Sequence, residues 1–94
     1  MEIKGKVFKN ETIILDGKTF VGCTFHSCEL VYQGSLVVGL VECSFHDVKW
    51  SFADAAARTI NFLAELYHGA GEGGRQLVEQ TFDKIRRDEY LRQG

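Results

Sequence analysis

Phe20-Val-Gly-Cys-Thr-Phe-His-Ser-Cys-Glu-Leu30 carries a large apolar residue at every fifth position, separated by small or polar residues. Within this stretch Cys23 and Cys28 also lie among polar neighbours, so apolar and polar side chains alternate over short distances. Alternation of this kind is typical of short β-strands that bury one face. We therefore expect residues 20–30 to form half-buried strands.

β-prone segments flank this stretch on both sides. Residues 3–8 and 12–15 precede it, and the Asp16-Gly17 dipeptide that follows them is a two-residue hairpin signal. Residues 35–41 are more continuously apolar, which predicts a strand covered on both faces. The sequence contains no proline that would mark a rigid linker, so we expect residues 1–52 to form one β unit.

A repeat lies within the β unit. Cys23-Thr-Phe-His-Ser27 recurs twenty residues later as Cys43-Ser-Phe-His-Asp47, and Leu30 is matched in the same register by Trp50. The steps of five residues resemble those of pentapeptide-repeat and other small β-solenoid proteins, in which one large apolar residue enters the core per step. A short meandering antiparallel sheet gives similar alternation, and stacked repeats generally need about three units. We favour a compact sheet with some coil-like turns.

From Ala53 onward the apolar period becomes helical. Ala56, Ile60, Leu63 and Tyr67 recur at the spacing of one helix face. The apolar stripe of a second helix comprises Leu77, Val78, Thr81, Phe82 and Ile85. The short connection between the two segments predicts that they are antiparallel neighbours.

The predicted fold class is α+β, with short N-terminal strands in an antiparallel or coil-like sheet followed by two antiparallel C-terminal helices at 53–68 and 74–87. We expect a single domain over residues 1–94. Its expected parts are a β unit at 1–52, a helical hairpin at 53–87 and a tail at 88–94.

Composition excludes several functional classes. The formal net charge of -2 gives no general attraction for nucleic acid or for membrane surfaces, and no apolar run approaches the ~20 residues of a membrane span. Three cysteines without a signal peptide predict reduced thiols in a cytoplasmic protein. So small a chain with a near-continuous apolar strand also predicts a homo-oligomer.

The glycine-rich segment Gly69-Ala-Gly-Glu-Gly-Gly-Arg75 lies between the two predicted helices. Gly73, Gly74 and Arg75 at a helix start would offer free N–H groups and a guanidinium group to a phosphate. The alternative is a flexible turn between antiparallel helices, with Gly69 as the residue that ends the first.

The histidines suggest a metal site and a general base, but the residues around them argue against both roles. Cys23 and His26 point to opposite faces of a strand, as do Cys43 and His46, so the pairs do not predict a metal site. His68 lacks an accompanying nucleophile or carboxylate pair, which favours a helix-capping role over general base catalysis. We therefore expect neither an enzyme nor a bound cofactor.

Three residues near the first helix have side chains suited to nucleosides. Trp50 and Phe52 offer aromatic faces on which a base can stack, or they belong to the core. Asn61 offers an amide that can pair with a base edge or ribose, or it is a polar interface residue.

The order of short strands and then two helices, joined by a glycine-rich turn with Arg75 opening the second helix, resembles the phage sponge proteins called Thoeris anti-defence proteins of the first type. Those small oligomers sequester cyclic ADP-ribose signals, and some bind cyclic oligonucleotides, in pockets between subunits. The resemblance implies that an aromatic residue (Trp50 or Phe52), Asn61 and Arg75 contact the ligand.

The predicted function is therefore non-catalytic binding and sequestration of a small cyclic nucleotide signal in the cytoplasm, of a host cell if the protein is phage-encoded. The predicted ligand-binding residues are Arg75, Gly73, Gly74, Asn61, Trp50 and Phe52. The predicted partners are the small phosphorylated nucleotide and further copies of the chain, with no nucleic-acid polymer and no membrane. The alternative function is a structural or protein-interaction module of small β-solenoid type without a small-molecule ligand.

Overall fold

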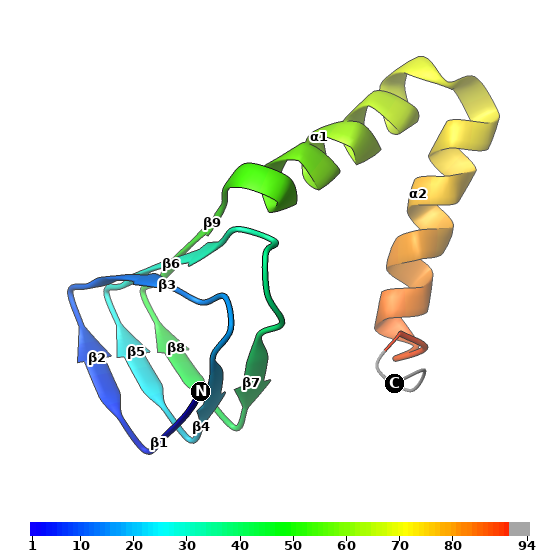
Figure 1. The fold of residues 1–94 in the computed structure, drawn as a ribbon. Coiled ribbons are helices and arrows are strands. Elements are labelled where there is room, and N and C mark those ends of the chain that lie inside the picture. Colours follow the sequence, from blue (N-terminus) through cyan, green and yellow to red (C-terminus); the bar gives the residue numbers. More distant parts are fainter. Residues whose placement is uncertain (91–94) are drawn as a thin grey trace. The chain divides into compact units, whose positions relative to one another are not determined.

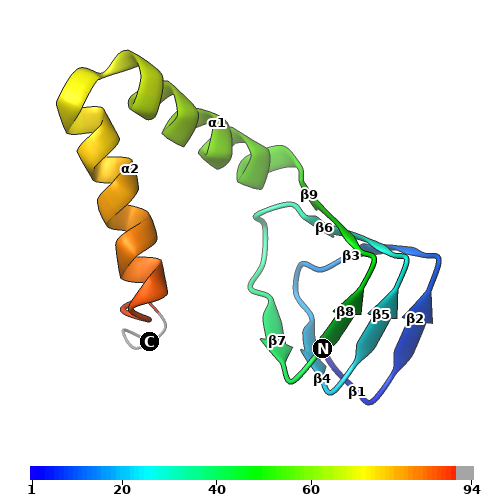
Figure 2. The ribbon, with the colours of Figure 1, turned by 180° about the vertical axis from the view of Figure 1, so that it is seen from behind.

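The first half of the chain winds into three stacked coils of short strands, shown in the computed structural model in Figures 1 and 2. The structure describes residues 1–90, and it divides into two compact units, Met1–Arg58 and Thr59–Gly94. Within the described residues the strands are β1 (Glu2–Lys4), β2 (Val7–Lys9), β3 (Thr12–Ile14), β4 (Thr19–Val21), β5 (Thr24–His26), β6 (Glu29–Tyr32), β7 (Gly39–Val41), β8 (Ser44–His46) and β9 (Lys49–Phe52).

All strand pairs of the first unit are parallel. They form three sheets of three strands each, in the orders β1-β4-β7, β2-β5-β8 and β3-β6-β9. Successive strands therefore belong to different sheets, and each set of three completes one coil: β1–β3 the first, β4–β6 the second and β7–β9 the third. Figure 1 shows β2, β5 and β8 side by side as one wall of this three-sided β-solenoid.

The predicted fold class with an antiparallel sheet is wrong, and the hairpin at Asp16-Gly17 is wrong with it. Gly17 joins β3 to β4, which lie in different sheets, and its N–H donates to the carbonyl of Val37 at 3.0 Å. The continuously apolar segment at 35–41 is also not one covered strand, because β7 begins only at Gly39 and Leu36 and Val37 are exposed.

The backbone conformation of the corners, the short turns that follow each strand, explains why the chain coils instead of forming hairpins. Each strand is followed by a residue with positive φ, and the corners form three columns, Gly5/Gly22/Glu42, Asn10/Ser27/Asp47 and Gly17/Gly34/Asp54. Left-handed backbone favours Gly, Asn and Asp, which occupy most of these positions. The corner N–H groups bond across coils, as from Asn10 to the His26 carbonyl at 3.0 Å.

The core is a set of ladders, each built from equivalent residues of successive coils. Phe8, Phe25 and Phe45 occupy equivalent positions of the three coils, and their rings stack at centroid distances of 5.0 and 5.3 Å. Phe20 and Leu30 flank this ladder from the other two sheets and are completely buried. The residues in steps of five are thus the inward-facing centres of successive strands.

Three extra residues interrupt the regular stacking between β6 and β7. Equivalent residues of the first two coils are 17 positions apart, whereas Phe25 and Phe45 of the second and third are 20 apart. The extra chain forms a loop at 33–38, held by the carboxylate of Asp16. This carboxylate accepts hydrogen bonds from the N–H groups of Gln33 (2.8 Å), Ser35 (2.8 Å) and Leu36 (3.3 Å) and from the Ser35 hydroxyl (3.1 Å).

The same loop anchors the first helix, α1 (Asp54–Gly69). The N–H of Ala56 donates to the Gln33 carbonyl at 3.1 Å. At Gly34, which has a φ of 78°, an added Cβ would lie 2.7 Å from the Ala56 nitrogen. The first turn of α1 therefore lies directly against the corner at Gln33 and Gly34.

Two helices are present, as expected, but their bounds differ from the prediction. α1 ends at Gly69, and α2 (Gly71–Arg86) begins three residues earlier than the expected start at residue 74. Within the second unit the helices diverge from the turn at Ala70, instead of lying along each other (Figures 1 and 2). The expected tail at 88–94 is described only to Tyr90, and residues 91–94 lie outside the described part of the chain.

We predict that Asp16 contributes stability that depends on pH. Partial burial of its carboxyl group disfavours the charged form, but the hydrogen bonds from Gln33, Ser35 and Leu36 outweigh this effect and lower its pKa from 3.8 to about 2. Because the folded-state pKa is depressed, the contribution is complete above pH 3.8 and is lost as the pH falls toward 2.

Thermal unfolding of wild type and Asp16→Asn tests this expectation. The variant should have the lower Tm at neutral pH, and the difference should shrink as the pH falls toward 2 and wild-type Asp16 becomes protonated. Equal Tm values at neutral pH would show that the Asp16 carboxylate does not hold the loop.

Candidate functional site

An apolar cavity of about 430 Å³ lies between the end of the third sheet and the loop before β7. Its walls are Leu15, Tyr32, Val37, Val38, Leu40, Trp50, Ser51 and Phe52. Trp50 and Phe52, both predicted as ligand residues, lie on β9 and are about half exposed. The structure thus brings these two aromatic side chains to one hollow.

The walls of this cavity carry no charged side chain. One polar group in the walls is the Ser51 hydroxyl, which already donates a hydrogen bond to Glu29 Oε2 at 2.7 Å. Glu29 Oε2 also lies 3.9 Å from Lys49 Nζ. The cavity therefore suits an apolar or aromatic group more than a phosphate.

Sequence reasoning missed Tyr32, which adds a third aromatic ring to this cavity. The register pairs Tyr32 with Phe52, just as it pairs Leu30 with Trp50. Extending the twenty-residue repeat by two positions would have identified Tyr32 from the sequence.

The glycine-rich segment has a different structure from the predicted anion site. Because α2 begins at Gly71, Gly74 lies within its first turn and its N–H donates to the Ala70 carbonyl at 3.4 Å. Arg75 Nη2 lies 3.6 Å from Glu72 Oε2 of the same helix, and the Arg75 side chain is about half exposed. The guanidinium group thus has a carboxylate neighbour in the unliganded chain.

Gly74 is required by packing within the second unit. It is buried, and a Cβ at this position would collide with the carbonyl oxygen of Leu66 and lie 2.7 Å from the Ala70 Cβ. Gly73 differs, because it is exposed and a Cβ there would meet nothing within 4 Å. Gly74 therefore allows the start of α2 to approach the end of α1.

The other predicted residues are distributed between the two units. Asn61 is exposed on α1 and belongs with Gly73, Gly74 and Arg75 to the second unit, whereas Trp50 and Phe52 belong to the first. His68 lies in the last turn of α1, and its ring packs edge-on against Tyr67 at a centroid distance of 5.2 Å.

Within each Cys-His pair, the cysteine and the histidine lie on opposite sides of the solenoid wall. Cys23 is buried, with its thiol 3.4 Å from the Ile3 carbonyl. On β5 and β8, the rings of His26 and His46 stack on each other at 4.8 Å. Among residues 1–90 no group of three His, Cys, Asp or Glu side chains is placed to hold a metal ion.

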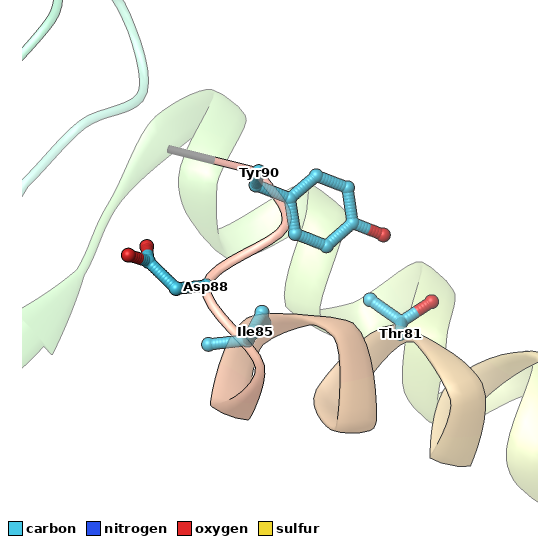
Figure 3. Close-up of a pocket in the computed structure, with 4 residues that line it drawn as sticks. All are labelled: Thr81, Ile85, Asp88 and Tyr90. Atoms are coloured by element: carbon cyan, nitrogen blue, oxygen red, sulfur yellow. The ribbon is translucent and has the colours of Figure 1, made fainter. Parts of the chain in front are cut away.

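A second hollow, of about 570 Å³, lies at the C-terminal end of α2. Figure 3 shows that Tyr90 folds back over the helix, so that its ring lies beside Thr81 and Ile85, with Asp88 at the margin. The Thr81 hydroxyl already donates to the Leu77 carbonyl at 2.8 Å. The surface that this hollow offers is therefore mainly apolar.

No family model, curated protein or solved structure gives a significant match to this chain. The resemblances to sponge proteins and to pentapeptide-repeat proteins therefore stay predictions. Neither described helix is long and apolar enough to cross a membrane.

We predict that the two adjacent glycines of α2 respond oppositely to substitution. Gly74→Ala should destabilise the second unit by about 1–3 kcal/mol, because the methyl group would collide with the Leu66 carbonyl. Gly73→Ala, the matched control, should stabilise it by up to about 1 kcal/mol, because alanine is the better helix former. Thermal unfolding followed by far-UV circular dichroism measures both. Equal effects would show that close packing does not explain Gly74.

Proposed function

We propose that the chain is a non-catalytic, self-associating protein-interaction module of β-solenoid type. The observation that carries this proposal is the exposed apolar surface of the second unit. Its exposed large apolar side chains include Ile60, Phe62, Leu77, Phe82 and Ile85.

Helix energetics support an interaction role. Isolated helices of this length are marginal in water, and protein helices gain most of their stability by packing an apolar face. The buried residues of α1 and α2 are only Ala56, Gly74 and Val78. Contact of the apolar side chains with a partner would supply the missing packing.

The charges on α2 and on Arg87, the residue that follows it, favour a protein partner over a polyanion. Arg87 Nη2 lies 3.0 Å from Asp83 Oδ2, and Arg86 Nη2 lies 3.9 Å from Asp83 Oδ1. Cations and carboxylates thus alternate on the exposed surface, and this arrangement provides no field of one sign to attract nucleic acid. A second copy would offer the apolar side chains a matching apolar surface.

The oligomeric state tests this proposal. Light scattering coupled to size-exclusion chromatography should give a multiple of the 10.6 kDa chain mass at micromolar concentration. Phe82→Asp should lower that mass, because association would then desolvate a carboxylate. The matched control Gln80→Asp, at another exposed position of α2, should retain it. A wild-type mass of 10.6 kDa at every concentration would contradict the proposal.

Nucleotide sequestration is the second candidate function, favoured by the three aromatic side chains at the cavity. Tyr32, Trp50 and Phe52 offer stacking faces, and 430 Å³ lies within the usual size range of small-molecule sites, about 300–1,000 Å³. The other predicted ligand residues, Arg75, Asn61, Gly73 and Gly74, belong to the second unit, and under this proposal they would contact the ligand from another copy of the chain.

A thermal-shift screen with cyclic ADP-ribose and cyclic oligonucleotides tests the second candidate. A ligand at 100 times its Kd should raise the free energy of unfolding by about 2.7 kcal/mol.

Arg75→Ala should weaken binding of such a ligand by about tenfold to a hundredfold, because one charge-assisted contact is lost. Lys84→Ala removes another exposed cation of α2 and should bind like wild type. If none of these nucleotides raises the Tm, sequestration is ruled out for this panel.

A further inference from the structure

The two ends of the solenoid differ in how well they bury their apolar side chains. In the first coil, Phe8 and Ile13 are only 7% and 8% exposed, although no coil precedes them. In the third coil, the inward-facing residues Leu40 and Trp50 are 42% and 48% exposed, and Phe45 is half-buried. We call the surface formed by these third-coil residues, Leu40, Phe45 and Trp50, the open end.

Charged residues occupy the opposite end. The register places Lys6 where the next coils carry Cys23 and Cys43. Lys6 Nζ lies 5.3 Å from the centroid of the Phe8 ring, so the ammonium group covers the apolar end of the phenylalanine ladder. By the same register, Glu11 precedes β3 where Val48 precedes β9.

The open end also presents unpaired strand edges. Among the described strands, β7, β8 and β9 each pair with one neighbour, as do β1, β2 and β3 at the opposite end, so one side of each strand directs backbone N–H and C=O groups outward. The first turn of α1 packs against Gln33 and Gly34 beside the second coil. Apolar side chains and free strand edges therefore coincide at one surface.

We infer that the open end binds the same open end of a second copy. Head-to-tail stacking in the same register would bring Lys6 against Cys43 and Glu11 against Val48, and the charges would lose hydration without a partner. Contact between two open ends joins apolar surface to apolar surface and edge to edge. Such a contact is isologous, so it closes as a dimer and does not extend into a filament. This inference rests on the proposed self-association and adds the open end to the apolar side chains of the second unit as a contact surface.

Trp50 reports on this contact without any substitution, because it is the only tryptophan of the chain. In the dimer its indole ring should be shielded from acrylamide, and its fluorescence should shift toward the blue. Leu40→Lys should halve the dimer mass to 10.6 kDa, expose Trp50 to acrylamide and retain the far-UV circular dichroism of the folded chain. The matched control is Val7→Lys, on β2 at the opposite end, where the wild-type side chain is 54% exposed. This variant should stay dimeric.

Two outcomes separate failure of this inference from failure of the proposed function. If Phe82→Asp dissociates the oligomer while Leu40→Lys retains it, association runs through the helices and the open end is not the interface. If wild-type Trp50 is as accessible to acrylamide in the oligomer as in a monomeric variant, the inference is likewise overturned. A wild-type protein that is monomeric at all concentrations overturns both. Should Leu40→Lys unfold, the quenching of wild-type Trp50 still decides.

Discussion

Stacking of equivalent apolar side chains along the solenoid axis is the interaction on which the structure depends. The rings of Phe8, Phe25 and Phe45 stack because the parallel strands that carry them are in one register. Each aromatic pair adds about 0.5–1.5 kcal/mol beyond its buried area. A slip by one residue would turn every ring outward, so the ladder fixes the register of all three sheets.

Parallel stacking leaves the solenoid with two ends, at the first and the third coil. This chain treats its ends differently. At the first coil Lys6 covers the Phe8 ring, whereas at the third coil Leu40 and Trp50 stay exposed. The exposed apolar residues of α1 and α2 increase this excess of unburied surface. The proposed self-association would cover this exposed apolar surface.

The loop at 33–38 contributes to the apolar cavity of the solenoid and also contacts the first turn of α1. Asp16 holds the loop through backbone N–H groups, and the bulge leaves the cavity that Trp50 and Phe52 line. The same loop receives the first turn of α1 through the Gln33 carbonyl. A change in the conformation of this loop would therefore alter the cavity and the attachment of the helix together.

The sequence by itself determined the inward-facing residues, since the steps of five from Phe20 to Leu30 and the echo of Cys23 at Cys43 reflect side-chain direction, which is local. It also determined that two helices follow, because their apolar period is local too. Strand direction was not determined, since parallel coils and antiparallel meanders give the same alternation. Only the tertiary structure decided it, through corner residues with positive φ such as Asn10 and Asp47. The role of Gly74 was likewise decided by a neighbour distant in space, the Leu66 carbonyl, which no local pattern reveals.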